Sequence, residues 1–327
     1  MKTSGIINID KPGGITSHGC VQTIRKLTGL KRVGHTGTLD PQATGVLPVC
    51  IGSAARVMEY LDLDFKKYRC GMMLGLVTDT QDVWGKVISD SREKLKGGAV
   101  ISRAGIEGAF ASFKGLIEQS PPIYSAIRVN GKRLYEYARA GEDVEIKKRK
   151  VFIEDISITD IDLDNLKISF DVVCSKGTYV RAICHEAGEK LGCGGAMSSL
   201  TRLASGAFKI EDAVSLDDLA RKNEEEIDRL IAPADYPLIH FGRATVKNPE
   251  IMERFVNGGI IEVNETYIEA MPEFAETDPP FNFREAYKRA YNIYAGAERA
   301  GVFLGVAFLN DQGVFAVDKI FFRRTGQ

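Results

Sequence analysis

Long apolar runs are absent from this sequence. It contains no stretch of about 18 consecutive apolar residues of the kind that spans a membrane. Its first residues, MKTSGIINIDKPGG, lack the apolar core of a secretory leader. Charged residues make up 27% of the chain, as in soluble globular proteins. We therefore expect a cytoplasmic protein with no membrane partner.

Cysteine and histidine are sparse, and their spacing matches no known ligand pattern. The six cysteines follow no disulfide-framework spacing, so we expect reduced thiols. Neither they nor the four histidines show the paired spacing of a metal site. The stretch KPGGITS (11–17) lacks the spacing of a phosphate-binding loop, and there is no serine nucleophile elbow. The sequence thus predicts no metal and no nucleotide cofactor.

A net charge of -1 hides an uneven distribution along the chain. Residues 1–150 contain 24 Lys and Arg against 15 Asp and Glu, a balance of +9, and the remainder balances at -10. A basic half indicates a polyanionic partner such as a nucleic acid. An unevenly charged but merely solvated surface explains the same count equally well.

Periodicity and turn residues predict an α+β fold in two parts. A large mixed domain is followed, after a boundary near 235–245, by a small β-rich domain with a hairpin around Asn310–Gly313. Pro48 predicts that its strand lies at an edge or ends there. The main elements expected are a helix capped by Ser17 and stopped by Gly29, strands at 46–51, 66–74 and 167–174, a short helix near 132–140, and a helix from about Thr178 to Gly192.

One stretch, GHTGTLDPQATGVLPV (34–49), places the carboxylate of Asp40 among glycines and threonines. Pro41 disfavours a helical backbone at Asp40. Gly37 and Gly45 permit close approach by another backbone or a ligand. An Asx turn that stabilises its own loop is the alternative explanation of Asp40.

Arg181 falls in the first turn of its predicted helix, where the helix dipole favours anions over cations. A carboxylate partner, for which Asp40 is a candidate, would remove this conflict and hold the carboxyl pKa low. A surface arginine whose stem covers apolar area is the alternative. Similarly, Tyr68 fits a core position on its strand, and His35 fits a loop histidine without a role.

Five co-linear blocks nevertheless resemble one known family. They are KPGGITS, GHTGTLDPQATGVLPVCIG, KKYRCGMMLGLVTDTQDVWG, QSPPIYSAIRVNGKRLYEYARAG and CSKGTYVRAICHEAGEKLG, followed by SSLTRLASGAF. Together they resemble the TruB family, bacterial tRNA pseudouridine synthases that act on uridine 55 of the TΨC loop. The fourth block is similar to the bacterial form rather than to the guide-RNA-dependent relatives of archaea and eukaryotes.

The resemblance implies a role for each matching residue. Asp40 matches the catalytic aspartate, Tyr68 the tyrosine that stacks on the target base, and Arg181 the partner of the carboxylate. Further matches are Tyr179 and Leu200 in the uracil pocket, His35 in the RNA-binding loop, Asp82 near the RNA, and Lys11, Pro12 and Gly37 in motifs beside the site. Arg128 departs from the family, because many relatives carry lysine there.

The resemblance also implies the domain organisation and the partners. Residues 1–240 correspond to a pseudouridine synthase domain, a mixed and mostly antiparallel sheet flanked by helices, with an RNA-clamping insertion at about 121–150. Residues 241–327 correspond to a PUA-like RNA-binding domain that carries an acidic insertion at about 265–300. The expected substrate is the T-arm of tRNA, bound by a monomer without an obligate protein partner or a cofactor.

Three alternatives remain at this level. A tRNA-binding or tRNA-folding protein on the same scaffold would not use Asp40. A pseudouridine synthase of another specificity would share the site but not the substrate. A metal-dependent hydrolase would need ligand spacing that the sequence lacks. Within the synthase hypothesis, the sequence leaves open whether the carboxylate attacks as a nucleophile or removes a proton from the sugar.

Overall fold

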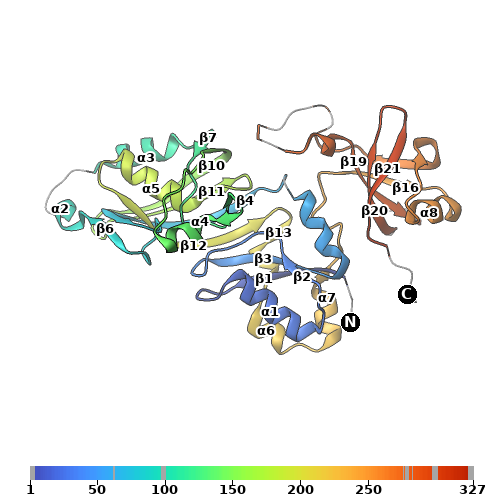
Figure 1. Cartoon of the computed structure of the whole chain (residues 1–327), viewed down its shortest axis with the longest axis horizontal. Coiled ribbons are helices and arrows are strands. Elements are labelled where there is room, and N and C mark those ends of the chain that lie inside the picture. Colours follow the sequence, from blue (N-terminus) through green and yellow to red (C-terminus); the bar gives the residue numbers. More distant parts are fainter. Residues whose placement is uncertain are drawn as a thin grey trace.

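A large sheet forms the centre of the main body of the protein (Figure 1). The computed structural model describes residues 4–61, 63–96, 101–274, 276, 280–281, 283–296 and 301–322. Among these residues no helix is long and apolar enough to cross a membrane. The six cysteines are all unpaired, as the sequence predicts.

The order of the strands confirms the predicted mixed sheet. Neighbouring strands are antiparallel except at the β1–β14 and β3–β12 pairs. The path runs through β14 (Val214–Ser215), β1 (Gly5–Lys11), β3 (Thr44–Ile51), β12 (Gly195–Ser205), β4 (Lys66–Leu74), β11 (Lys167–Cys174), β10 (Arg149–Asp162) and β7 (Gly115–Gln119). Short additions are β2 (Val33–His35), β13 (Phe208–Lys209) and β15 (Ile231–Ala232).

Alternating apolar residues on the central strands bury one sheet face under helices. Ile24, Phe110 and Ile183 from three helices join Cys70 and Phe170 from the strands in one core cluster. The helices are α1 (Ser17–Thr28), α2 (Arg92–Lys96), α3 (Arg103–Ala111), α5 (Val180–Lys190), α6 (Leu216–Ala220) and α7 (Glu224–Leu230), with 3-10 turns η1 (Gly52–Tyr60) and η2 (Ile210–Asp212).

Local predictions hold for most of these elements and fail at two points. Strands 66–74 and 167–174 have the predicted bounds, and Gly29 ends α1 in a left-handed conformation. The cap of α1, however, is Thr16, because Ser17 points inward. The edge prediction for Pro48 is also wrong, since β3 lies between β1 and β12. The Thr36 N–H, one residue past the end of β2, donates to the Pro48 carbonyl. The nitrogen of Pro48 is on the same side of β3, where the pairing with β2 ends. A proline, which has no N–H to donate, is therefore tolerated there.

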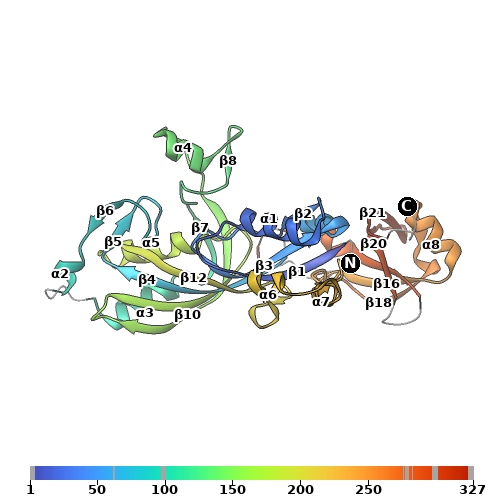
Figure 2. The ribbon, with the colours of Figure 1, turned by 90° about the horizontal axis from the view of Figure 1, so that it is seen from below.

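Most of residues 121–150 leave the main body as a projection (Figure 2), but the last two, Arg149 and Lys150, already belong to β10 of the large sheet. The projection contains β8 (Arg128–Val129), β9 (Lys132–Arg133) and α4 (Leu134–Ala140). Leu134 is fully buried, and the Tyr137 hydroxyl donates to the Val129 carbonyl at 3.1 Å. These contacts give the projection a small structured tip of its own.

A second, six-stranded sheet follows residue 241 and contains the predicted hairpin, β20–β21. Its order is β17 (Ile261–Glu262), β21 (Val314–Ile320), β20 (Val302–Leu309), β19 (Ala290–Ala295), β16 (Gly242–Val246) and β18 (Thr266–Ala270), with α8 (Pro249–Val256), η3 (Val263–Glu265) and η4 (Glu285–Arg289). The segment expected as an acidic insertion, 265–300, therefore supplies β18 and β19 to this sheet. Its residues 275, 277–279, 282 and 297–300 lie outside the described residues.

Aromatic side chains join the second sheet to the main body. The ring of Tyr60 lies 5.4 Å from that of Phe241 and 6.2 Å from that of Tyr287. The Tyr287 hydroxyl donates to the Glu59 carbonyl at 2.5 Å, and Arg56 donates to the Ile320 carbonyl at 3.0 Å. Buried aromatic contacts with satisfied polar tips fix the two parts against each other.

Candidate active site

The loop that carries Asp40 is held from both sides. Before it, the Ser17 hydroxyl donates to the Leu39 carbonyl at 3.0 Å and accepts from the Leu39 N–H at 2.9 Å. After it, the Ala43 N–H donates to the Asp40 carbonyl at 3.1 Å and closes a tight turn. The backbone at Asp40 is thus fixed by neighbours on both sides.

Lys11 lies beneath this loop and is fully buried. Its ammonium donates to the carbonyls of Pro12 and Pro41 at 2.9 Å and of Ala43 at 2.7 Å. Burial lowers the pKa of Lys11, and the nearby charge of Asp40 opposes that shift. Lys11 therefore ties Pro12 to the turn that presents Asp40.

Substitution of Lys11 by Met is expected to lower the free energy of unfolding by about 2–4 kcal/mol, because three carbonyls lose their donor. Urea unfolding of the two proteins measures this difference. Lys26→Met on the exposed side of α1 is the matched control and should stay within about 0.5 kcal/mol of the wild type. An equal effect of both substitutions would contradict the assigned role of Lys11.

Gly45 and Gly37 differ in whether the surrounding structure leaves room for a side chain. Gly45 has a φ of +95°, and a Cβ there would lie 2.3 Å from the carbonyl oxygen of Arg202. Arg202, itself 1% exposed, donates to the carbonyls of Val46 at 2.6 Å and Gly37 at 3.1 Å. At Gly37 a Cβ would make only ordinary contacts, 3.7 Å from the nearest atom. Close backbone approach therefore explains Gly45 but not Gly37.

Gly45→Ala is expected to destabilise the protein by about 2–4 kcal/mol, since it adds both a backbone collision and a strained φ. Gly108→Ala on α3 is the control, because a Cβ at Gly108 meets nothing within 4 Å. It should change stability by less than about 1 kcal/mol, in the stabilising direction. Thermal unfolding of both variants tests the prediction, and a fully stable Gly45→Ala protein would refute it.

Arg181 and Asp40 form a two-point ion pair. Arg181 Nε lies 2.9 Å from Asp40 Oδ2, and Nη2 donates to Oδ1 at 3.3 Å. The guanidinium also donates to the carbonyls of Thr80 at 2.9 Å and Tyr124 at 3.0 Å. The Arg181 side chain is 6% exposed but that of Asp40 is 37% exposed. The arginine is thus an immobile, buried partner, while the carboxylate remains open to a substrate.

The position of Arg181 at the start of α5 is fixed by a neighbouring clamp. The buried side chain of Gln119 donates to the Tyr179 carbonyl at 3.1 Å and accepts from the Tyr179 N–H at 2.8 Å. This amide satisfies backbone groups at the helix N-terminus. Tyr179 is the N-cap of α5, so the same two bonds fix the helix start from which Arg181 extends.

The pKa of Asp40 is raised above its ordinary value, chiefly by burial. The charge and hydrogen bonds of Arg181 oppose this shift, whereas the charge of Asp82 adds to it. The expectation that Arg181 holds the pKa low is therefore wrong in its net direction, because burial outweighs the ion pair.

Tyr68 and Leu200 lie on adjacent strands, β4 and β12, and are 7% and 8% exposed. Both belong to the main core cluster, so the core interpretation of Tyr68 holds. Burial raises the pKa of Tyr68, and the charge of Asp40 contributes to the same shift. Tyr68 is thus a neutral aromatic side chain within electrostatic reach of the carboxylate.

His35 is the last residue of β2, where it pairs with Val49, and so lies on a strand rather than in the expected loop, whereas Asp82 lies in a loop and its charge acts on Asp40. Burial and the charge of Arg202 lower the pKa of His35, so its ring is neutral near pH 7. Its Nδ1 is buried and has no hydrogen-bond partner among the described residues. Asp82 accepts from the Thr80 hydroxyl at 2.7 Å and from the Trp84 N–H at 3.1 Å. Asp82 therefore shapes the loop whose Thr80 carbonyl holds Arg181.

Sequence reasoning missed several residues that position this site, namely Ser17 as a loop anchor, Thr80, Gln119, Tyr124 and Arg202. Thr80 and Gln119 both fall within blocks that carry the family resemblance, but nothing local in the sequence assigns either of them a role. Across the described part of the chain, no group of three His, Cys, Asp or Glu side chains is arranged to hold a metal ion.

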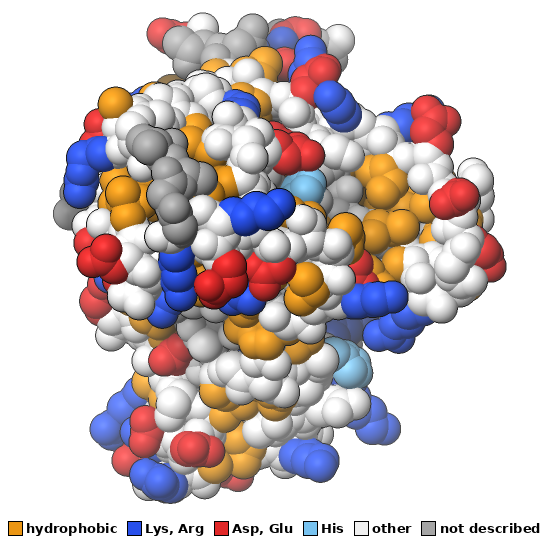
Figure 3. Space-filling model, turned by 90° about the vertical axis from the view of Figure 1, so that its left-hand side faces the viewer, with side chains coloured by type: hydrophobic (Ala, Val, Ile, Leu, Met, Phe, Trp, Pro, Cys, Tyr) orange, Lys and Arg blue, Asp and Glu red, His pale blue; other side chains and the backbone are white. Residues whose placement is uncertain are grey.

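Surface charge at one end of the molecule is mixed. Figure 3 shows the face at the left-hand end of Figure 1, on which basic and acidic side chains alternate. The basic excess of residues 1–150 is not gathered on this face. Basic residues are densest in sequence where the projecting segment rejoins the large sheet at the start of β10, at Lys147, Lys148, Arg149 and Lys150.

Comparison with known proteins gives consistent matches. The model of the TruB family pseudouridylate synthase N-terminal domain matches residues 25–180, and that of the tRNA pseudouridylate synthase B C-terminal domain matches residues 181–239. The tRNA pseudouridine synthase B of Alkaliphilus oremlandii is 44% identical over 261 residues, which cover 80% of this chain and 84% of that protein. The same enzyme of Clostridioides difficile is 45% identical over 260 residues, 79% of this chain and 84% of that protein.

Solved structures agree over nearly the whole chain. A chain in the crystal structure of a Cbf5-Nop10-Gar1 complex superposes with a TM-score of 0.73 at 25% identity, over 98% of this chain and 86% of that chain. The similarity therefore extends through the second sheet as well as the main body.

Proposed function

Because the chain belongs to the TruB family of pseudouridylate synthases, we propose that it converts uridine 55 in the TΨC loop of tRNA to pseudouridine, with Asp40 as the reacting carboxylate. The chain is a tRNA pseudouridine synthase on the strength of its relatives. The observation that supports Asp40 is its pairing with buried Arg181 while its own side chain stays 37% exposed.

The chemistry is an isomerisation that a carboxylate can promote. The bond between uracil N1 and ribose C1′ breaks, the base turns, and a bond between C5 and C1′ forms. N1 gains a proton and the C5 proton passes to water, so no atom is lost and no electron acceptor is consumed. Asp40 must be ionised either to attack the nucleotide or to remove a proton from the sugar. Arg181 stabilises that ionised form and fixes its orientation.

The target base has to leave its stacked loop before Asp40 can reach it. In our proposal Tyr68, Leu200 and Tyr179 supply the apolar surface that the uracil ring packs on. Stacking of a base on an aromatic ring contributes about 1–3 kcal/mol in single-strand binders, and Tyr68 has that role in our proposal. The neutral ring of His35 would occupy the space that the base vacates.

The rest of the tRNA contact is assigned to three regions. The projecting segment at 121–150 clamps the T-arm, the basic residues of 1–150 contact phosphates, and the sheet after residue 241 acts as a PUA-like RNA-binding domain. Residues 1–240 form the catalytic domain in this scheme. The protein acts as a cytoplasmic monomer without a protein partner.

Binding of tRNA is expected to weaken steeply with salt, because phosphate contacts release counterions. Lys147→Ala combined with Lys148→Ala should reduce the slope of log Kd against log salt by about 1–2. Lys94→Ala on α2 is the control and should leave the slope unchanged. An unchanged slope in the double variant would show that this basic cluster is only solvated.

A tritium-release assay tests the reaction itself. The isomerisation expels the C5 hydrogen, so tRNA transcribed with uridine tritiated at C5 should release tritium to water. A T-arm hairpin should serve as a substrate, and the same hairpin with uridine 55 replaced by cytidine should release none. Tritium release from the cytidine-substituted hairpin would contradict the proposal. So would the absence of release from both hairpins.

A further inference from the structure

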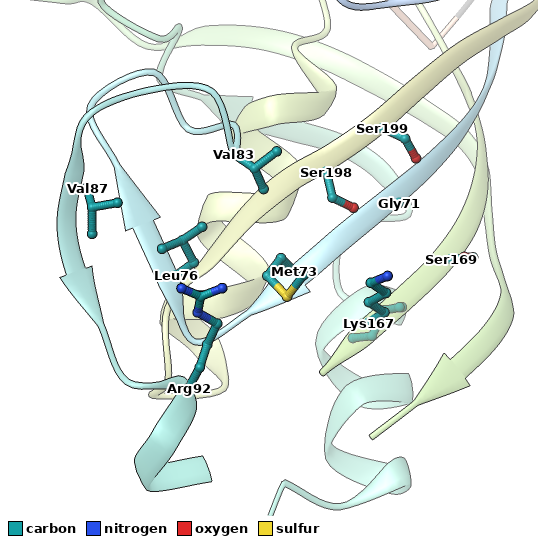
Figure 4. A pocket seen from close by; sticks show the side chains of 11 residues that line it. Gly71, Met73, Leu76, Val83, Val87, Arg92, Lys167, Ser169, Ser198 and Ser199 are labelled. Carbon is teal, nitrogen blue, oxygen red and sulfur yellow. The ribbon is translucent and has the colours of Figure 1, made fainter. Parts of the chain in front are cut away.

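A groove of about 550 Å³ lies on the large sheet, away from the site around Asp40 (Figure 4). Gly71 and Met73 on β4 face it, and they alternate with Cys70 and Met72, which face the helix-covered core. Since successive residues of a strand point to opposite faces, the groove and Tyr68 are on opposite sides of the sheet. The groove is therefore separate from the proposed uracil pocket.

Two neighbouring serines are directed into this groove by an irregularity in β12. The pairing of β12 with β4 shifts register between Met197 and Ser199, and Figure 4 shows Ser198 and Ser199 both pointing toward Gly71. A Cβ at Gly71 would lie 2.5 Å from the Ser199 hydroxyl and 2.9 Å from the Ser198 hydroxyl. Glycine thus leaves the space in front of both hydroxyls open. Neither hydroxyl forms a hydrogen bond with another side chain or carbonyl in the described part of the chain.

Cationic and apolar groups complete the lining. Lys167 of β11 lies beside the serines, and it is also the cross-strand neighbour of Asp162 on β10, whose carboxylate its charge influences. On the other side of Met73, Arg92 is paired with Asp90 at 2.6 Å. Met73 lies between the two cations, and Leu76, Val83 and Val87 extend the apolar lining on the side of Met73 away from Lys167 (Figure 4). One end of the groove therefore offers an ammonium and free hydroxyls, and the rest offers apolar surface.

We propose that this groove binds a phosphate monoester with a flat or apolar body, of the size of a mononucleotide. An ammonium and several hydroxyls are the donors that a phosphate group needs. The volume falls within the range of small-molecule sites, roughly 300–1,000 Å³. Lys167, Ser198 and Ser199 hold the phosphate, and the body packs on Met73 and Val83. This site is additional to the tRNA substrate and independent of the proposed reaction.

The groove also touches the loop that anchors Arg181. The Val83 N–H donates to the Met197 carbonyl at 2.9 Å, and the Met197 N–H donates to the Gln81 carbonyl at 3.0 Å. Residue 80 of the same loop accepts from Arg181. A ligand packed on Val83 is thus expected to slow exchange of the amides at 81–83.

Calorimetric titration of the full chain, without RNA, tests the proposal with uridine 5′-monophosphate and with inorganic phosphate as probes. Lys167→Met and the double variant Ser198→Ala/Ser199→Ala should each raise the Kd for the nucleotide at least about tenfold, because hydrogen bonds to a charged group are lost. Lys222→Met is the control and should bind as the wild type does. Unchanged melting temperatures exclude misfolding as the cause.

Hydrogen–deuterium exchange locates the bound probe. Protection at 71–73, 81–83 and 167–169 supports the groove, and tighter binding of the nucleotide than of inorganic phosphate shows that the apolar wall contributes. Absence of binding by both probes at millimolar concentration would overturn the proposal. Protection at 35–40 alone, or binding that the groove variants leave unchanged, would overturn it as well. None of these results depends on pseudouridine formation.

Discussion

Replacement of Asp40 by Asn is expected to slow pseudouridine formation at least about 1,000-fold, because the reaction loses its only assigned nucleophile or base. The amide has the shape of the carboxylate, so Lys11 and Ser17 should still hold the loop in place. Arg181 keeps its bonds to the carbonyls of Thr80 and Tyr124. The rate is measured by tritium release under single-turnover conditions.

Two controls separate chemistry from structure in this experiment. The Kd for tRNA of Asp40→Asn should match the wild type, whereas its melting temperature should fall slightly, because buried Arg181 loses its charged partner but keeps its bonds to the carbonyls of Thr80 and Tyr124. Asp164→Asn, an exposed aspartate on the loop between β10 and β11, should retain full activity. A rate for Asp40→Asn within tenfold of the wild type would exclude Asp40 as the reacting group.

Arg181→Lys is expected to reduce the rate at pH 7 about 100-fold or more and to move the acid limb of the pH–rate profile upward. Burial raises the pKa of Asp40 and Arg181 opposes that shift, so weakening the pair lets the pKa rise further. The reaction uses ionised Asp40, and activity is therefore lost as pH falls through that pKa. The variant should lose more activity at pH 6 than at pH 8, relative to the wild type.

The same substitution should also lower stability by about 1–3 kcal/mol, since a lysine cannot serve the carboxylate and two carbonyls together. This loss of stability is smaller than for a fully buried pair because Asp40 is partly exposed.

Reaction rates measured from pH 5 to pH 9 for the wild type and Arg181→Lys test the predicted shift of the pH–rate profile. A parallel loss at every pH would show that Arg181 does not govern the ionisation of Asp40.

The pairing of Asp40 with Arg181 was implied by the family resemblance, and two local signals had already made the two residues candidate partners. A cation in the first turn of a helix requires an explanation, and a carboxylate before proline is presented from a non-helical backbone. Strands 66–74 and 167–174 were equally accessible because their buried residues alternate strictly. In each case the signal lies within about ten residues.

Features that depend on distant neighbours could not be predicted in the same way. Gln119 contacts Tyr179 across 60 positions, and Arg181 contacts Thr80 across 101. Nothing near these residues in sequence announces a hydrogen bond to backbone atoms so far along the chain. The predicted direction of the pKa shift at Asp40 was wrong for the same reason. Burial within the assembled site, which the sequence does not show, raises that pKa. The prediction that Pro48 marks an edge strand was wrong because the pairing of β3 with β2 ends beside Pro48. No backbone N–H is required at that position.

Mapping of pseudouridine in an unmodified tRNA transcript tests the central claim most directly. The transcript is incubated with the wild type and with Asp40→Asn, without added metal or cofactor, and modified positions are located by carbodiimide labelling and primer extension. We predict one stop, at uridine 55 of the T-loop, with the wild type alone. Salt-sensitive binding by both proteins without any stop, or the same stop with both, would contradict the account.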